Sequence, residues 1–319
     1  TVPGSTLDRV RPSTLFGFYV QDDYRATDRL TLNLGLRYEF YTIPSEKFGL
    51  DSTLHDIVRD TEFTVGPLFA KNPSLKNWAP RLGFAWDVNG DGRMALRGGA
   101  GLYHDTDGPF NSALGQAASV PPFAVSATIA NPAFPRPVSL TASAPSARPL
   151  DYNIKQPYGA TFNVNLQREL PGQMTVTVGY AGSRAYNLVA AVEGNPNVPQ
   201  ISADGSKFFP AVAVRRNPAF GPIDYRTSAA RSEYNSLQLS AQKRFSQRYQ
   251  IQATYTLAKS MDNMQGQLGF DVNNSPIFPQ DPYDRDREWA ASDFDGRHVA
   301  TTNFVWDLPG DAANPLTGG

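Results

Sequence analysis

The sequence predicts an all-β protein, a partial antiparallel transmembrane β-barrel that supplies about nine strands of a larger barrel. Three observations predict it: strict alternation of apolar and polar residues, connections that alternate between very short and very long, and aromatic residues near the strand ends. Strands of about 10 residues with short periplasmic turns and long extracellular loops are typical of such barrels. The lengths of the connections decide between a membrane barrel and a β-sandwich, because a β-sandwich shows the same alternation.

The clearest strand covers residues 29–41, where Leu30, Leu32, Leu34 and Leu36 share one phase and polar residues take the other. Its period of two over a dozen residues exceeds the usual strand of about 5 or 6 residues. We expect the apolar phase to face lipid. A short helical turn is expected only at 285–294. The nine predicted strands are 15–25, 29–41, 79–88, 93–104, 157–170, 174–186, 231–246, 248–261 and 296–308.

The connections fall into two length classes. Four turns of four residues or fewer alternate with four links of more than 30 residues, at about 42–78, 105–157, 187–231 and 262–295. Loops of that length are uncommon in compact soluble domains but are expected on the outer side of a membrane barrel. The second link is rich in proline between 121 and 157, which predicts a stiff, extended surface loop.

Aromatic residues gather near both ends of the predicted strands, as they do at the two lipid head-group interfaces of a membrane barrel. The bland alternative is the general preference of aromatic residues for strands. At the long-loop ends lie Tyr38, Phe40, Tyr41, Tyr103, Tyr158 and Tyr180, and at the short-turn ends lie Trp86, Phe245, Tyr249 and Trp306.

Composition excludes several classes of protein. The formal net charge is -1, from 29 basic and 30 acidic residues, so no nucleic acid partner is expected. The absence of cysteine excludes disulfide scaffolds, cysteine-ligated metals and thiol nucleophiles. No run of about 18 apolar residues offers a membrane helix. The N-terminus lacks the pattern of a signal peptide, so we expect another export route or a piece of something longer.

One stretch of the sequence resembles a calcium-binding loop. Asp87, Asn89, Asp91 and Gly92 fit positions 1, 3, 5 and 6 of an EF-hand, but position 12 is Gly98 and no helices flank the stretch. We interpret it as a hairpin turn in which Asn-Gly and Asp-Gly pairs supply positive φ angles.

No catalytic, metal-binding or cofactor-binding residues are predicted. The histidines His55, His104 and His298 are far apart in the sequence, and neither HExxH nor GxSxG occurs. The candidate for ligand contact is the acidic, aromatic loop 281–296, which ends the last long link. Its aromatic rings and cations suit a polar ligand, whereas the alternative is an internally paired outer loop or a cation site. The candidate residues are Tyr283, Arg285, Arg287 and Trp289.

Four segments carry a family resemblance: NLGLRYEF (33–40), APRLGFAWDVNGDGRMALRGGAGLYHD (79–105), SLQLSAQKRFSQRYQIQATYTLAKSMD (236–262) and RHVATTNFVWDLP (297–309). They resemble the barrel of TonB-dependent outer-membrane transporters, and most of all the receptors whose N-terminus carries a carboxypeptidase-regulatory-like domain. The resemblance implies a location in the outer membrane of a Gram-negative-type bacterium and energised uptake of an unidentified ligand.

The resemblance also implies partners for the chain. A barrel of this family has 22 strands, a plug domain inside its lumen and a segment before the plug that binds the TonB complex. We therefore expect residues 1–319 to be one internal fragment of the barrel domain, without the plug, in contact with outer-membrane lipid. Two other classes stay open: a soluble all-β binding module and an outer-membrane barrel hydrolase.

Overall fold

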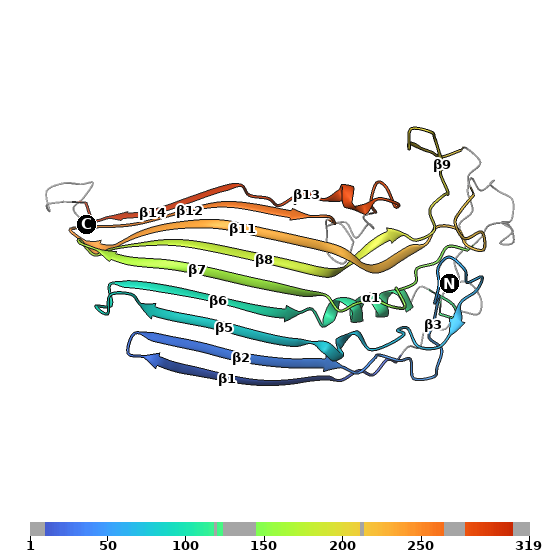
Figure 1. Cartoon of the computed structure of the whole chain (residues 1–319), viewed down its shortest axis with the longest axis horizontal. Helices are drawn as coiled ribbons and strands as arrows, with labels where there is room; N and C mark the ends of the chain where they lie inside the picture. The colour runs from blue at the N-terminus through green and yellow to red at the C-terminus, as the bar shows by residue number, and fades with distance from the viewer. Residues whose placement is uncertain (1–9, 118–119, 124–144, 211–213, 265–277, 309–319) are drawn as a thin grey trace.

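The computed structural model describes residues 10–117, 120–123, 145–210, 214–264 and 278–308. Its main feature is one antiparallel sheet in which nine long strands lie side by side in chain order (Figure 1). Each strand pairs with the next, and β12 pairs with both β14 and the two-residue strand β13. The strands are β1 Leu15–Thr27, β2 Leu30–Tyr41, β5 Trp78–Asp87, β6 Met94–His104, β7 Tyr158–Leu170, β8 Met174–Glu193, β11 Asp224–Ser246, β12 Tyr249–Asp262, β13 Ala290–Ala291 and β14 His298–Trp306.

The smaller elements lie in the long connections, at one end of the sheet (Figure 1). Among the described residues, no helix is long and apolar enough to cross a bilayer. The smaller elements are β3 Ser52–Thr53, β4 Thr64–Val65, the 3-10 helix η1 Pro73–Lys76, α1 Asp107–Ala117, β9 Gln200–Ile201, β10 Lys207–Phe208 and the 3-10 helix η2 Arg285–Glu288.

The register of the sheet separates an apolar face from a polar face. Residues paired directly across two antiparallel strands lie on the same face. Leu34 on β2 pairs with Leu82, which pairs with Ala100, which in turn pairs with Phe162. Asn33 on the other phase donates to Asp23 at 2.6 Å, so the polar residues also meet across strands. The alternation read in single strands therefore extends across the sheet, with Asp22 as a charged exception on β1 opposite Leu34.

Aromatic side chains form a row across the apolar face near the long-loop end. Phe16 stacks on Phe40 at 5.1 Å, Tyr38 stacks on Trp78 at 4.4 Å, and the rings of Tyr158 and Tyr186 lie 5.4 Å apart. At the short-turn end, Tyr249 pairs with Trp306, and the Lys243 ammonium lies 4.0 Å from the Tyr249 ring centroid.

Two of the predicted interface aromatics belong elsewhere. Tyr41 is buried at the end of β2, where its side chain is 3% exposed. Tyr103 lies on the polar phase of β6, because its partner Gly159 alternates with the apolar positions of β7. Strand position alone led to the wrong face for both residues.

Strands β8 and β11 run farther than the sequence predicted. The expected bounds were 174–186 and 231–246, whereas pairing continues from Ala185 and Ser232 as far as Glu193 and Asp224. The extension carries Val189, Ala190, Ala191 and Val192, all buried. A strand buried on both faces loses its alternation, and this hid the extension. The long link expected at 187–231 is correspondingly shorter.

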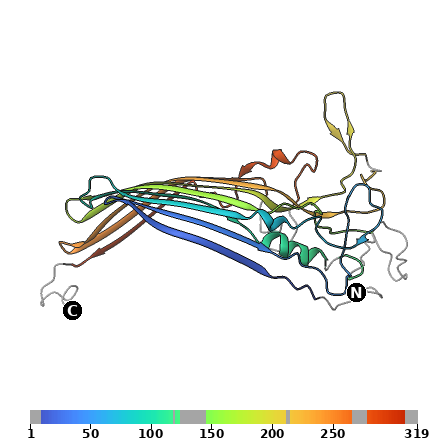
Figure 2. The ribbon, with the colours of Figure 1, turned by 60° about the horizontal axis from the view of Figure 1, so that its bottom comes forward.

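The sheet is open and curved (Figure 2). Within the described residues, β1 pairs only with β2 and β14 pairs only with β12, so each leaves one edge of backbone donors and acceptors without a strand. All nine residues of β14 are exposed, as are twelve of the thirteen in β1. Free edges of this length are incompatible with a bilayer unless further strands cover them.

Candidate functional site

The connections at the long-loop end pack against one another and form a folded cap. One buried cluster joins the link after β2, helix α1, the segment before β7 and the upper part of β8. A second joins the link after β2 to the segments that flank β11. The first contains Leu68, Phe69, Ala113, Leu150, Ile154 and Val189, and the second contains Leu54, Ala147, Phe220 and Ile223.

The proline-rich link contributes to this cap where it is described. Gly221 donates its N–H to the Pro145 carbonyl at 2.9 Å, and Arg226 donates to the Pro149 carbonyl at 3.2 Å. Residues 145–150 therefore lie along the start of β11, and isolated parallel bridges join Ala147 to Ile223 and Leu150 to Arg226. The stretch 124–144, with Pro132, Pro135 and Pro137, lies outside the described residues.

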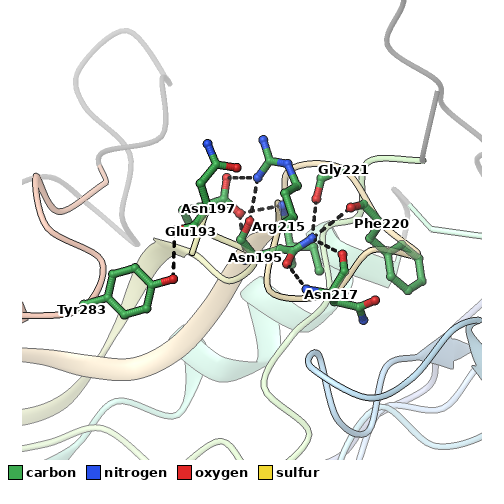
Figure 3. Close-up of polar contacts among 9 residues, drawn as sticks. Glu193, Asn195, Asn197, Arg215, Asn217, Phe220, Gly221 and Tyr283 are labelled. Carbon is green, nitrogen blue, oxygen red and sulfur yellow. Dashed lines mark hydrogen bonds and ion pairs between the residues drawn. The ribbon is translucent and has the colours of Figure 1, made fainter. Parts of the chain in front are cut away.

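Asn195 holds the link between β8 and β11 in its folded path (Figure 3). The residue is fully buried, and its Nδ2 donates to the carbonyls of Asn217, Phe220 and Gly221 at 2.8–2.9 Å. Asn217 in turn donates its side-chain N–H groups to the carbonyls of Ile57 and Asp60 at 3.0 and 2.8 Å. Two carboxamides thus connect two extended links of the cap.

Tyr283 is the predicted ligand residue whose environment is best defined. Its hydroxyl donates to the Asn197 carbonyl at 2.9 Å (Figure 3), and its ring stays 40% exposed. Lys207 lies beside it, with the ammonium 5.7 Å from the ring centroid and an ion pair to Asp281. Partial burial raises the pKa of the Tyr283 hydroxyl, and the hydrogen bond from Lys207 lowers the pKa of the Asp281 carboxyl.

The other three predicted residues have separate surroundings. Arg287 pairs with Asp284 at 2.8 Å. Trp289 directly follows η2, and the Arg231 guanidinium lies 4.9 Å from its ring centroid. Arg285 is exposed in η2. The loop therefore presents Tyr283 and Trp289 at either end of a single 3-10 turn, which is shorter than the helical turn expected at 285–294.

A second exposed surface adjoins Tyr283, and sequence reasoning missed it. The β9–β10 hairpin and its flanks carry apolar side chains that are about half exposed or more. The turn could have been predicted from Asp204-Gly205, since Gly205 has φ 81° and Asp204 accepts from Ser206 N–H at 2.9 Å. Lys207 pairs with Ile201 and Phe208 with Gln200, so the exposed apolar side chains lie on both faces of the hairpin. These residues, together called the hairpin patch below, are Val198, Ile201, Phe208, Phe209 and Val214.

The three histidines are not brought together. His55 stacks on Tyr152 with ring centroids 4.1 Å apart, a ring nitrogen of His104 lies 3.1 Å from the Trp78 carbonyl, and His298 is bonded to the Tyr255 hydroxyl at 2.7 Å. Within the described part of the chain, no three His, Asp or Glu side chains are grouped closely enough to hold a metal ion.

In the acidic turn after β5, the carboxylates accept hydrogen bonds from backbone N–H groups of the same turn. The two carboxylate oxygens of Asp87 accept from the N–H groups of Gly90 and Gly92, each at 2.9 Å, and Asp91 accepts from Arg93 N–H. Gly90 and Gly92 adopt φ 78° and 72°. The turn therefore uses its carboxylates for backbone geometry, as the hairpin interpretation expects.

Comparison with known proteins places the chain in a family. A family model described as an outer membrane beta barrel domain matches residues 5–318. Among solved structures, the Escherichia coli outer membrane transporter YddB is similar with a TM-score of 0.50 and 11% identity, covering 92% of this chain and 31% of that one. No curated protein sequence matches.

Two further structures are similar at lower scores. The alcaligin outer membrane receptor FauA of Bordetella pertussis has a TM-score of 0.41 and 12% identity, covering 93% of this chain and 35% of that one. The ferripyoverdine receptor of the Pseudomonas aeruginosa outer membrane has a TM-score of 0.43 and 12% identity, covering 93% and 26%. The chain thus spans between 26% and 35% of the length of these three structures.

The family match and the sheet together confirm the predicted fold class, a partial antiparallel transmembrane β-barrel with short periplasmic turns and long extracellular loops. They also establish the cell outer membrane as its location. The chain belongs to the outer membrane beta barrel domain family.

Proposed function

We propose that this chain supplies barrel strands and outer loops to a TonB-dependent receptor that takes up a substrate with energy from the inner membrane. The observation that carries the proposal is the two-faced sheet, apolar between two rows of aromatic residues and polar on the opposite face. Leu30 and Tyr38 bound the apolar stretch of β2 and are eight residues apart, about 26 Å along a strand. An outer-membrane barrel carries an apolar band about 25 Å tall.

The free edges of β1 and β14 support a larger barrel around this sheet. An unpaired backbone group costs several kcal/mol in hydrocarbon, so both edges require partner strands in the membrane. We propose that the remaining strands and a plug domain belong to the same protein, and that the plug lies against the polar face. In this arrangement residues 1–319 form one stretch of the barrel domain, and contact with the TonB complex is made by another part of the protein.

The substrate is proposed to bind at the cap, on the loop that carries Tyr283, Arg285, Arg287 and Trp289. Lys207, which lies beside the exposed ring of Tyr283, belongs to the β9–β10 hairpin and pairs there with Ile201, so a cation lies next to exposed apolar side chains. Exposed aromatic and apolar side chains with adjacent cations suit a ligand that has both a ring or hydrocarbon part and an anionic part. The substrate itself is not specified by these residues.

Uptake by the full-length protein tests the proposal. The gene would be expressed in a bacterium whose proton-motive force can be collapsed with an ionophore, and labelled solutes from the native habitat would be screened for uptake. We expect uptake that stops with the ionophore and that weakens in apparent affinity for Tyr283→Ala and Trp289→Ala. Phe48→Ala is the matched control, an exposed aromatic on another link. Uptake that persists without the proton-motive force would reject energised transport.

A further inference from the structure

The polar face contains a hollow between strands β1, β2 and β5. Its volume is about 230 Å³, and it is lined by Tyr19, Gln21, Gly35, Arg37 and Arg81 together with the neighbouring backbone. Gly35 forms the floor because it has no side chain, and a Cβ built there would touch Arg81 Cβ at an ordinary 3.7 Å. The hollow is smaller than the roughly 300 Å³ of the smallest typical ligand pockets. It therefore suits one chemical group of a partner.

Two arginines border the hollow, and their guanidinium groups have different partners. The Arg37 guanidinium forms an ion pair with Glu39 at 2.7 Å. Arg81 has a different contact, since its guanidinium lies 4.7 Å from the centroid of the Tyr103 ring. Within the described residues, Arg81 has no carboxylate or hydrogen-bond acceptor as a partner. One positive charge is thus left without a counter-charge beside the hollow.

Two glycines leave the space that the side chains of Arg37, Arg81 and Tyr103 occupy. A Cβ at Gly17 would lie 3.2 Å from an Arg37 guanidinium nitrogen. A Cβ at Gly101 would lie 3.2 Å from the Tyr103 ring and 3.3 Å from Arg81 Cγ. Stacking on an aromatic face leaves the in-plane N–H groups of a guanidinium free to donate, and a carboxylate is the group that matches this fork. Tyr19 and Gln21 add neutral hydrogen-bonding groups on the opposite side of the hollow.

We propose that this hollow is a carboxylate-binding site on the inner surface of the barrel, with Arg81 as the residue that pairs with the anion. The proposal rests on the proposed function only in treating the polar face as the inner surface. The carboxylate belongs either to a side chain of polypeptide that fills the barrel or to a solute that enters it. The chemistry is the same in both cases, and the experiment separates them.

Arginine-selective dicarbonyl labelling of the full-length protein in detergent, read by mass spectrometry, tests the site. Arg81 is compared with Arg93, an exposed arginine in the turn after β5. Protection of Arg81 that is independent of added citrate supports a polypeptide carboxylate. Protection that appears only with citrate supports a solute. Labelling of Arg81 at the rate of Arg93, with and without citrate, would overturn the proposal.

A Gly35→Leu variant distinguishes an anion from simple steric shielding. Leucine fills the hollow and expels the carboxylate, so Arg81 labelling should rise to the rate of Arg93. Unchanged or slower labelling in this variant would show that shielding protects Arg81 and would reject the site. Arg97→Gln is the matched control, because Arg97 already donates to Gln167 at 2.5 Å, and it should leave Arg81 labelling unchanged. Uptake is not measured here, so failure of energised transport would leave these results intact.

Discussion

The side-chain amide of Asn195 pairs with the backbone of Asn217 in both directions. Asn195 Nδ2 donates to the Asn217 carbonyl at 2.8 Å, and Asn195 Oδ1 accepts from the Asn217 N–H at 2.6 Å. The side chain therefore replaces a neighbouring strand in a part of the cap where none is present. Arg215 adds a bond from its guanidinium to the Asn195 carbonyl at 2.6 Å. Asn195 thus joins the two ends of the link between β8 and β11.

Replacing Asn195 is expected to open the link locally. In Asn195→Asp, three backbone carbonyls lose their donor while the Asn217 N–H keeps an acceptor, and in Asn195→Ala both are lost. Each buried group left unpaired costs about 1–3 kcal/mol. Hydrogen exchange of the full-length protein should show residues 195–210 and 214–223, apart from Asn217, exchanging faster in both variants, and the Asn217 amide exchanging faster only in the alanine variant. Asn197→Ala keeps the carbonyl that Tyr283 contacts and serves as control. Unchanged exchange in Asn195→Ala would contradict the structural role.

A second prediction concerns which face of the sheet contacts lipid. Leu34 lies on the apolar phase opposite Leu82, and Asn33 lies on the polar phase beside Asp23. Leu34→Arg should destabilise the full-length barrel by about 2–4 kcal/mol, as charged substitutions do on the lipid face near mid-bilayer. Asn33→Arg should be nearly neutral, because the arginine can pair with Asp23. Urea unfolding in lipid vesicles measures both, and equal tolerance at the two positions would show that the assigned faces are wrong.

The sheet was predictable from sequence because successive side chains of a strand point to opposite faces, so the apolar and polar residues alternate along the chain. Leu30, Leu32, Leu34 and Leu36 must share a face in any strand, and pairing in chain order then fixes the neighbours. The cap was not predictable, because Val189 and Val192 are buried by contacts that arrive from distant links. Helix α1 contradicts the expectation that a helical turn occurs only at 285–294. Its sequence signals were weak: Asp105, which accepts from the Gly108 N–H at 2.9 Å, and Pro109 in the first turn.

The candidate site was only partly predictable for the same reason. The composition of loop 281–296 drew attention to Tyr283 and Trp289, but no local pattern shows that Tyr283 reaches Asn197, 86 residues away. The hairpin patch was not predictable from sequence, because short apolar runs between loops resemble ordinary strand residues. Its role in ligand contact stays a prediction.

The contact between Lys207 and Asp281 should make the cap sensitive to acid. The pKa of Asp281 in the folded protein is below its ordinary value of 3.8, chiefly because Lys207 donates a hydrogen bond to the carboxylate. The stabilisation is therefore present above the ordinary value and is lost as pH falls through the lowered value. The protection of residues 200–208 against hydrogen exchange, taken relative to the intrinsic exchange rate at each pH, should fall below about pH 4 in the wild type. Lys207→Met should show low protection at every pH, whereas Lys155→Met, an exposed lysine elsewhere in the cap, should behave as wild type. A pH-independent difference between wild type and Lys207→Met would contradict the assignment.

The turn after β5 is expected not to bind calcium. Both oxygens of Asp87 are committed to the N–H groups of Gly90 and Gly92, so no pair of free carboxylates faces an ion. Added calcium should leave the melting temperature unchanged in the wild type and in the double variant Asp87→Asn, Asp91→Asn. Asp87→Ala should destabilise the turn by about 1–3 kcal/mol through its two unpaired amides. A calcium-dependent rise in melting temperature that disappears in the double variant would reveal a metal site.

Residues 1–319 expressed alone should neither stay monomeric in water nor form a pore. The described part of the sheet has two free edges, and an open sheet cannot remain in a bilayer because its unpaired backbone groups meet hydrocarbon. In water the apolar face becomes the difficulty, since soluble monomers rarely expose apolar patches larger than a few hundred Å². Light scattering without detergent should therefore report aggregates, and a monodisperse monomer that melts cooperatively would favour the soluble β-module instead. The residues that form this face include Leu30, Leu32, Leu34, Leu36, Phe162, Val164, Leu166, Val176, Val178, Ile251 and Tyr255.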